Sequence, residues 1–232
     1  GVAEGAKMAL AGRSFLDEAD FNLHFVTEGP SKAAVDEAYA RLRKLAEAEG
    51  GRSVEPTIPK VIRANPFTPL NNMIGPDAER WVPVHGIVAM GDGPACWAEI
   101  EALFADYAER FKAHDVTTGT LITTLGTTGY LIEPVFLWPD ELFALHEEHV
   151  ETGYLRGLKR KPADPAATEL VAEARTAVVE VFKGYGAAHF QVGRTYPLAE
   201  TRSAPALALL KSVKAALDPD NLINPGALGL GG

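Results

Sequence analysis

The sequence of 232 residues is poor in cysteine, with Cys96 as its one example. A single cysteine excludes an intrachain disulfide framework and any metal site built from several cysteines. No apolar run approaches the ~20 residues that a membrane-spanning helix needs. The first residues also lack the basic-then-apolar pattern of a secretory signal. We therefore expect a cytoplasmic protein with no membrane partner.

A long basic run is also missing. The formal net charge is −9, and acidic and basic residues are interspersed. This distribution disfavours binding to nucleic-acid backbones or to anionic membrane surfaces. It leaves small anionic or phenolic ligands open, because the local charge of a site can oppose the net charge. The apolar fraction of 47% is enough to bury one substantial core.

Several catalytic and binding signatures are absent from the sequence. There is no GxGxxG or GxxxxGK[ST] phosphate cradle and no GxSxG nucleophile elbow. His146 and His149 form the run HEEH, but neither the HExxH nor the HxxEH zinc pattern is present and no third ligand is evident. We expect no metal site and interpret this run as a solvated helix face.

What is present indicates an α+β fold. FNLHFVTE (21–28) alternates apolar and polar residues, which is typical of a strand with one buried face. A helix should follow from Ser31 to Gly50, with a returning strand somewhere in 52–64. WVPVHGIVAM (81–90) begins a second unit of the same kind.

In that second unit a helix follows Asp92, and then two β-rich segments, 118–125 and 130–138, are joined by a Gly-containing turn. Strand–helix–strand occurring twice predicts a ferredoxin-like antiparallel sheet with helices on one face. After residue 138 the pattern becomes helical. We therefore predict a ferredoxin-like region at 1–140 and a C-terminal helical region at 141–232.

Arg194 is the first candidate for chemistry. An extended HFQVGRTYP (189–197) would place Phe190, Val192, Arg194 and Tyr196 on one side. A guanidinium on such an apolar face needs an anion or an acceptor. Either Arg194 pairs with a surface glutamate, or it binds an anionic ligand.

Two further candidates lie on the predicted strands. Glu133 shares a strand face with Leu131, Val135 and Leu137, so it is either ion-paired or has a raised pKa and handles protons. On another strand, Trp81 and His85 share a face, with Pro83 between them as the mark of an edge or a bulge. They are either a core and a surface residue, or substrate contacts.

Taken together, IEPVFLWPDEL (132–142), HFQVGRTYPLAETRSAP (189–205) and LDPDNLINPGALGL (217–230) resemble FAD-linked oxidoreductases of the vanillyl-alcohol oxidase/4-cresol dehydrogenase type. PFTPLNNMIGPDAERWVPVHG (66–86) is similar to the loop and strand before the central strand of their cap sheet. The resemblance covers most of the chain. It implies the substrate-covering cap of a flavoprotein.

The resemblance also implies roles for individual residues. Arg194 would lie beside the flavin and the substrate as the catalytic cation, with Asn224 and Gln191 as further cofactor contacts. The expected substrate contacts are Glu133, Tyr196, His85 and Trp81. Members of the family carry a Tyr immediately before the matching Arg, whereas this chain has Gly193. The role of that Tyr in holding a phenolate is therefore not carried over.

The resemblance implies oxidation of a phenolic or alcohol-type small substrate by hydride transfer to FAD. The FAD would be held mainly by a domain absent from this chain, so the chain alone should be inactive. That FAD-binding domain, on the same or a separate polypeptide, is the expected partner, and a homodimer stays open. The alternative is a stand-alone ferredoxin-like module that binds a ligand or a subunit without catalysis.

Overall fold

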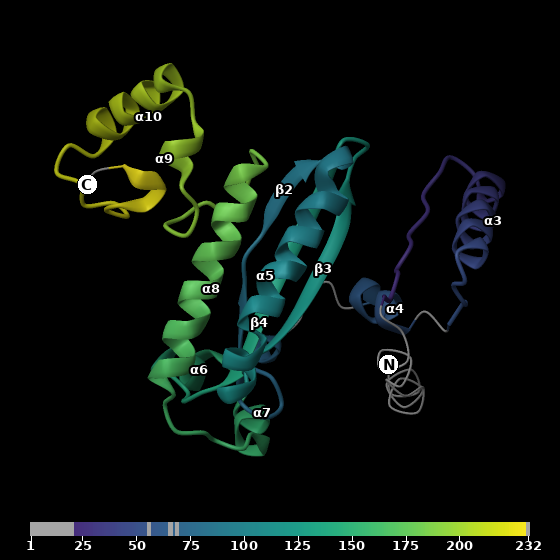
Figure 1. The fold of residues 1–232 in the computed structure, drawn as a ribbon, viewed down its shortest axis with the longest axis horizontal. Helices are drawn as coiled ribbons and strands as arrows, with labels where there is room; N and C mark the ends of the chain where they lie inside the picture. Colours follow the sequence, from purple (N-terminus) through teal and green to yellow (C-terminus); the bar gives the residue numbers. More distant parts are fainter. Residues whose placement is uncertain (1–20, 55–56, 65–66, 68–69, 231–232) are drawn as a thin grey trace. The chain divides into compact units, whose positions relative to one another are not determined.

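The computed structural model describes residues 21–54, 57–64, 67 and 70–230 (Figure 1). By its internal contacts the chain divides into two units, 1–68 and 69–232. This division differs from the predicted one at residue 140. The predicted return of residues 141–232 to a flavin-binding domain stays a prediction.

In its described residues, the first unit contains the helices α3 (Lys32–Ala48) and α4 (Thr57–Ala64). Ser31 caps α3, and its side chain accepts a hydrogen bond from the backbone N–H of Ala34, as an N-cap serine typically does. The predicted helix after Ser31 is therefore confirmed. The returning strand predicted in 52–64 is wrong, because α4 occupies most of that segment.

The strand predicted at 21–28 is also wrong. These residues have no regular structure, and Phe21, Leu23 and Phe25 are exposed. An alternating pattern forms a strand only where a neighbouring strand satisfies its backbone hydrogen bonds. Among the described residues, none pairs with this segment.

The second unit contains the sheet. Its elements in chain order are η1 (Leu70–Met73), β1 (Glu79–Pro83), β2 (Gly86–Ala89), η2 (Met90–Asp92), α5 (Gly93–Ala113), β3 (Thr117–Leu125), β4 (Gly129–Pro139), α6 (Ala144–His149), α7 (Thr152–Gly157), α8 (Pro165–Gly184), α9 (Leu198–Thr201), α10 (Ala204–Leu217) and η3 (Ala227–Gly229). In the described part of the chain, no helix is long and apolar enough to cross a membrane.

β4 is the central strand. It pairs antiparallel with β3 on one side and with β1 and β2 on the other. β1 and β2 keep one register against β4, from Glu79 opposite Pro139 to Ala89 opposite Gly129. They therefore form one long strand that is interrupted at Val84 and His85.

The chain order of these elements is ferredoxin-like. After β1–β2, α5, β3, β4 and α8, Ala188 forms an antiparallel bridge with Ile87 of β2. Strand–helix–strand–strand–helix–strand is the ferredoxin-like pattern. The predicted α+β class is confirmed, but residues 79–189 build this pattern, and the predicted first unit at 21–64 does not contribute a strand.

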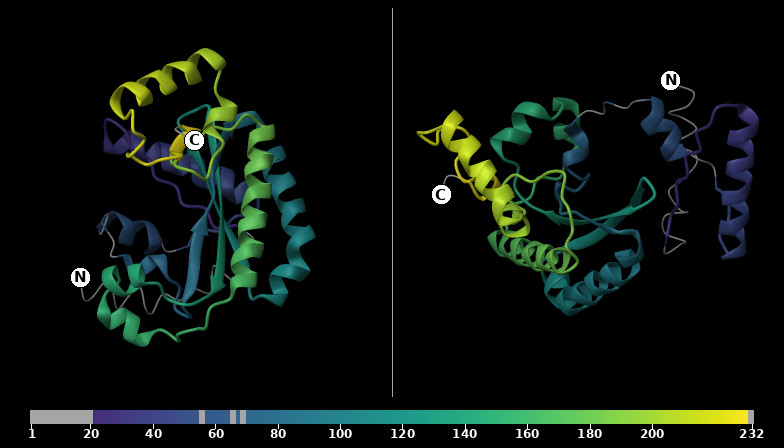
Figure 2. Two further views of the ribbon diagram at one scale, coloured as in Figure 1. Left: turned by 90° about the vertical axis from the view of Figure 1, so that its left-hand side faces the viewer. Right: turned by 90° about the horizontal axis from the view of Figure 1, so that it is seen from above.

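α5 and α8 pack against each other and cover the same face of the sheet (Figure 2). Because strand side chains alternate, Ile132 and Phe136 of β4 point to this face and are fully buried. They meet Ile100 from α5 and Phe182 from α8 in one core. Gly86 is needed beside this core, because a Cβ there would lie 2.3 Å from the Phe182 ring.

The opposite side of the sheet, which α5 and α8 do not cover, is called the open face below. The odd-numbered residues of β4 point to it, with Glu133 among them. In the adjacent strands, Trp81 lies opposite Leu137, and Leu121 lies opposite Glu133. Trp81 and Leu121 are 44% and 55% exposed. The open face therefore offers apolar surface on the same side of the sheet as the carboxyl group of Glu133.

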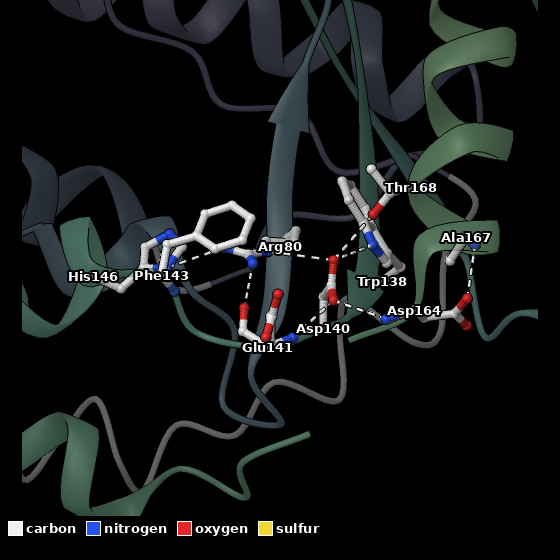
Figure 3. A network of polar contacts seen from close by, with 9 residues as sticks. All are labelled: Arg80, Trp138, Asp140, Glu141, Phe143, His146, Asp164, Ala167 and Thr168. Carbon is white, nitrogen blue, oxygen red and sulfur yellow. Dashed lines mark hydrogen bonds and ion pairs between the residues drawn. The ribbon is translucent and has the colours of Figure 1, made fainter. Parts of the chain in front are cut away.

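A buried carboxylate, Asp140, joins the end of β4 to the start of α8 (Figure 3). It accepts hydrogen bonds from the backbone N–H groups of Glu141 (2.8 Å) and Asp164 (3.1 Å). The Trp138 indole (3.2 Å) and the Thr168 hydroxyl (3.1 Å) also donate to it. Burial alone would raise the pKa of Asp140, but these donors and a nearby arginine outweigh it and lower the pKa.

That arginine is Arg80 of β1, whose Nε lies 3.7 Å from Asp140 Oδ2. Its guanidinium also donates to the Glu141 carbonyl, stacks over the Phe143 ring at 3.7 Å and contacts the His146 ring nitrogens. His146 is therefore buried, and the solvated position predicted for it is wrong. The sequence pattern missed this because the partner of His146 lies 66 residues away.

We predict that Asp140→Ala lowers the free energy of unfolding by about 3–5 kcal/mol at pH 7, because it leaves Arg80 buried without its counter-charge. Urea unfolding followed by circular dichroism measures the change. Asp77→Ala is the matched control, since it removes an exposed ion pair with Lys159 and should cost less than ~1 kcal/mol. Equal losses in both variants would contradict the structural role of Asp140.

Candidate functional site

The candidate site begins at the free edge of β1–β2. At His85 the strand turns its backbone N–H and C=O away from β4. The N–H donates to the Tyr196 hydroxyl oxygen (2.8 Å), and the C=O accepts from His189 Nδ1 (2.7 Å). Two residues on, Ile87 exchanges both backbone hydrogen bonds with Ala188 at 2.9 Å. The side chains of Tyr196 and His189 thus satisfy the N–H and C=O groups that a neighbouring strand would otherwise pair with, and the edge is protected.

The His85 ring is buried at 1% exposure and is hydrogen-bonded on both nitrogens. Nε2 accepts the backbone N–H of Phe190 (3.0 Å), and Nδ1 lies 2.7 Å from the Tyr196 oxygen. Burial, with a smaller contribution from His189, lowers the pKa of His85 to about 4. The neutral ring must therefore carry its proton on Nδ1 and donate it to Tyr196.

Tyr196 is buried, and its ring stacks on that of His189 with centroids 4.0 Å apart. Its oxygen accepts two hydrogen bonds, from the backbone N–H and from the Nδ1–H of His85. Burial is the main cause that raises the pKa of Tyr196, so the hydroxyl is protonated near neutral pH. His189 also has a lowered pKa, chiefly because of burial.

Glu133 of β4 belongs to the same neighbourhood. Pro83 pairs with Val135 and Gly86 with Ile132, so His85 falls opposite Glu133 in the register. Glu133 is half-buried, and burial raises its pKa. Of the two alternatives predicted for Glu133, an ion pair or a raised pKa, this direction favours the second. Trp81 is on the same open face, four residues before His85.

Arg194 lies at a second place, where the C-terminal bend returns. Its guanidinium is exposed and donates to the carbonyl of Pro225. The neighbouring Gly193 carbonyl accepts the backbone N–H of Leu228 at 2.7 Å. Asn224 has a left-handed backbone (φ 46°) at the start of this bend. The Asn-Pro-Gly turn therefore holds the arginine.

The bend has its own support in Asp218, just after α10. Its carboxylate accepts the backbone N–H groups of Leu222 (2.8 Å) and Ile223 (3.0 Å) and pairs with Lys214. Lys214 also donates to the Ile223 carbonyl at 2.7 Å. Residues 218–226 are thus a hydrogen-bonded turn that fixes the group to which Arg194 binds.

The extended conformation predicted for 189–197 is wrong. After the bridge at Ala188 the chain bends and turns, and Gly193 has a φ of +41°. Phe190 and Arg194 are exposed while Tyr196 is buried, so the three do not share one side. A strand pattern could not reveal this, because the turn serves to bring Tyr196 back onto His85.

The structure brings together some of the predicted site residues. His85 and Tyr196 are in direct contact, and Glu133 lies opposite His85 in the register. Arg194 and Asn224 meet at the C-terminal bend, whereas Gln191 is exposed. Their catalytic and binding roles stay predictions.

Sequence reasoning missed His189 as a member of this cluster. The expected alternation placed it on the side opposite Tyr196, whereas the two rings stack. The available signal was that His189 begins the segment 189–197, which also contains Tyr196.

These features define an α+β domain in which α5 and α8 cover one face of the sheet and polar side chains lie along an edge. The sequence matches the family of FAD linked oxidases, C-terminal domain, over residues 2–228. The chain therefore belongs to this family. FAD is the cofactor of the enzymes that contain this domain, and the domain is a part of them rather than the main binder of FAD.

A search of the curated proteins found no match. Among solved structures, an alkyldihydroxyacetonephosphate synthase aligns with a TM-score of 0.44 at 13% sequence identity. The alignment covers 84% of this chain and 29% of that one, so this chain spans less than a third of that protein's length.

We predict that the stability of the protein falls by roughly 2 kcal/mol between pH 7 and pH 5 on account of His85. Its pKa is about 4 in the folded protein and near 6.5 in an unfolded chain. Protons therefore bind the unfolded state first, and the contribution present above the unfolded pKa is lost as the pH falls toward the folded value.

Urea unfolding at the two pH values measures this loss. His85→Gln should show a smaller loss than wild type, and His149→Gln, which removes an exposed imidazole, should keep the wild-type slope. The neutral, buried state of His85 is contradicted if His85→Gln and wild type lose the same amount.

Proposed function

We propose that this chain is the substrate-covering part of an FAD-dependent oxidoreductase of the vanillyl-alcohol oxidase/4-cresol dehydrogenase type. Such an enzyme oxidises a phenolic or alcohol-type small substrate by hydride transfer to flavin. The observation that carries the proposal is the open face, where Glu133 lies opposite His85, His85 contacts Tyr196, and Trp81 lies four residues before His85. Membership in the FAD-linked oxidase family supports it. A cytoplasmic location is part of the same proposal.

The residues present fit a flavin ring in their chemistry. The ring is flat and largely apolar, and it gains negative charge on reduction. The exposed Trp81 and Leu121 supply apolar surface, and Arg194 supplies a cation held by the Pro225 carbonyl. Bound FAD provides the hydride acceptor, while the protein provides orientation and charge. Asn224 and Gln191 are proposed as further contacts to the cofactor.

Glu133 and Arg194 carry different parts of the proposed mechanism. The raised pKa of Glu133 suits a group that accepts a hydrogen bond from a substrate hydroxyl and holds its proton. Arg194 stabilises negative charge on the substrate or on the reduced cofactor. Trp81, His85 and Tyr196 orient the substrate on the open face. In this proposal Glu133, on the sheet, handles the proton, and Arg194, at the C-terminal bend, stabilises the charge.

α10 supports the proposed partner, an FAD-binding domain or subunit. Leu209, Val213 and Leu217 follow one another at helical spacing and are 66%, 47% and 77% exposed. Leu222 and Ile223, in the following turn, are exposed as well. An apolar stripe of this kind is typical of a docking surface, and we propose that the FAD-binding part covers it.

Arg194→Ala should lower the turnover number by at least about tenfold in the full-length, FAD-loaded protein, because charge on the reduced ring or substrate loses its cation. The reduction of flavin absorbance by a panel of phenolic and benzylic alcohols measures this. Arg110→Ala removes an exposed arginine that pairs with Glu173 on the helical side and should keep wild-type turnover. Near-wild-type activity of Arg194→Ala would refute the assigned role.

Leu209→Asp should weaken docking of the FAD-binding part by about 2 kcal/mol, since it places a charge in the proposed apolar contact. The ratio of flavin to protein absorbance after gel filtration of the full-length protein reports the loss. Lys211→Asp, on the same helix but off the stripe, is the matched control and should retain FAD. Equal FAD content in both variants would show that the stripe is not the docking surface.

A further inference from the structure

Arg175, on α8, is a cation that has no counter-charge among the described residues. Its Nη2 lies 3.4 Å from the carbonyl of Pro83, which is a weak contact. Its Nε is buried and has no hydrogen-bond partner in the described part of the chain. None of the carboxylates that the structure describes forms an ion pair with it. Burial accordingly lowers the pKa of Arg175. A partly buried guanidinium in this state is costly unless its charge serves another group.

The link between β1 and β2 joins Arg175 to Tyr196: the guanidinium contacts the Pro83 carbonyl, and two residues on, the backbone N–H of His85 donates to the Tyr196 oxygen. Burial and the carboxyl group of Glu133 raise the pKa of this phenol, whereas the backbone N–H of His85 and the charge of Arg175 lower it. His189 stacks on the ring as a second neutral imidazole. These four residues, from β4, from the link between β1 and β2, from α8 and from the segment after it, are the titratable and charged groups that face Tyr196.

The hydrogen-bond geometry leaves the hydroxyl hydrogen of Tyr196 without a partner among the described residues. Both lone pairs of the Tyr196 oxygen are used, by the backbone N–H and by the Nδ1–H of His85. The alternative, in which Tyr196 donates to Nδ1, would protonate Nε2 and set it against the N–H of Phe190. The hydroxyl hydrogen therefore points away from His85, and the described residues offer it no acceptor. The Tyr196 hydroxyl can therefore donate a hydrogen bond to an oxygen atom of a ligand.

We propose that Arg175 acts through Tyr196: its charge, together with the two N–H groups of His85, makes the hydroxyl a strong hydrogen-bond donor to a ligand oxygen that carries or develops negative charge. Tyr196 would touch the ligand, and Arg175 is a positioning residue that tunes it. The ligand class is a phenolate, an alkoxide or a carboxylate. The proposal depends on the proposed function only for the identity of that ligand, not for the coupling of Arg175 to Tyr196.

The coupling is tested by titrating tyrosinate absorbance at 295 nm in the full-length protein. The difference between wild type and Tyr196→Phe isolates Tyr196. Arg175→Met should move the titration of Tyr196 to higher pH, whereas Arg175→Lys, which keeps the charge, should restore most of the wild-type position. Arg160→Met, which removes an exposed arginine that pairs with Glu147, should leave it in place. Superimposable titrations of Tyr196 in wild type and Arg175→Met would overturn the proposal, including the case where neither ionises before unfolding.

A purely structural arginine makes a different prediction. Arg175→Met would then lower the melting temperature and leave the Tyr196 titration unchanged. A cation without a counter-charge, in contrast, is replaced by a residue of similar volume without loss of stability. An unchanged or higher melting temperature together with a shifted titration supports the proposal.

The consequence for a ligand is measured separately. With a turned-over phenolic or benzylic alcohol, Tyr196→Phe should lower kcat/KM about 100-fold and Arg175→Met about tenfold. If no such substrate reduces the flavin, the proposed function fails while the titration still decides the coupling. If turnover is found and Arg175→Met matches wild type, the ligand role of the coupling is wrong.

Discussion

The contact between Tyr196 and His85 is the interaction on which the arrangement of residues beside the open face depends. A sheet edge with free N–H and C=O groups is a liability in water and in contact with other proteins. Here the edge beside His85 is satisfied by a phenol and an imidazole from one short segment, with a single bridge at Ala188. The same hydrogen bonds fix a neutral histidine and a protonated tyrosine next to the open face. The hydrogen bonds that protect the sheet edge therefore also hold the residues of the candidate site in place.

Two further constraints position the parts around this contact. Asp140 and Arg80 anchor the ends of β4 and β1 to α8 (Figure 3). Asp218 holds the C-terminal turn to which Arg194 binds. Asp140 and Asp218 are both buried carboxylates that accept hydrogen bonds from backbone N–H groups. Such charge-assisted hydrogen bonds are strong, so they hold the backbone around each carboxylate in place. Arg194 and the apolar stripe of α10 stay exposed, as the proposed contacts with a flavin and with an FAD-binding domain require.

The sequence predicted the parts of the fold that local pattern controls. The helix after Ser31, the hairpin of β3 and β4, and the shared face of Glu133 and Leu131 follow from capping, turn residues and alternation. It failed where a distant partner decides: 21–28 has a strand pattern but no neighbouring strand, and Ala188 has a neighbour 101 residues away in β2. The ferredoxin-like pattern was therefore expected, but in the wrong segments.

The candidate site shows the same limit. The residue types of His85, Tyr196, Glu133 and Arg194 marked them as candidates, yet nothing local indicated which would meet. The turn after His189 separates Arg194 from Tyr196, which an extended segment would have kept together. The proposed coupling of Arg175 to Tyr196 connects α8 to a loop, and only the three-dimensional structure shows that both contact the link between β1 and β2.

The central claim is that the open face of the sheet covers a flavin. The most direct measurement is the electron density of FAD in crystals of the full-length protein. The account predicts the ring against the open face, on the side of Glu133 and Tyr196, with the Arg194 guanidinium in contact with it. A ring bound on the side of α5 and α8, or out of reach of both Arg194 and Glu133, would contradict the account.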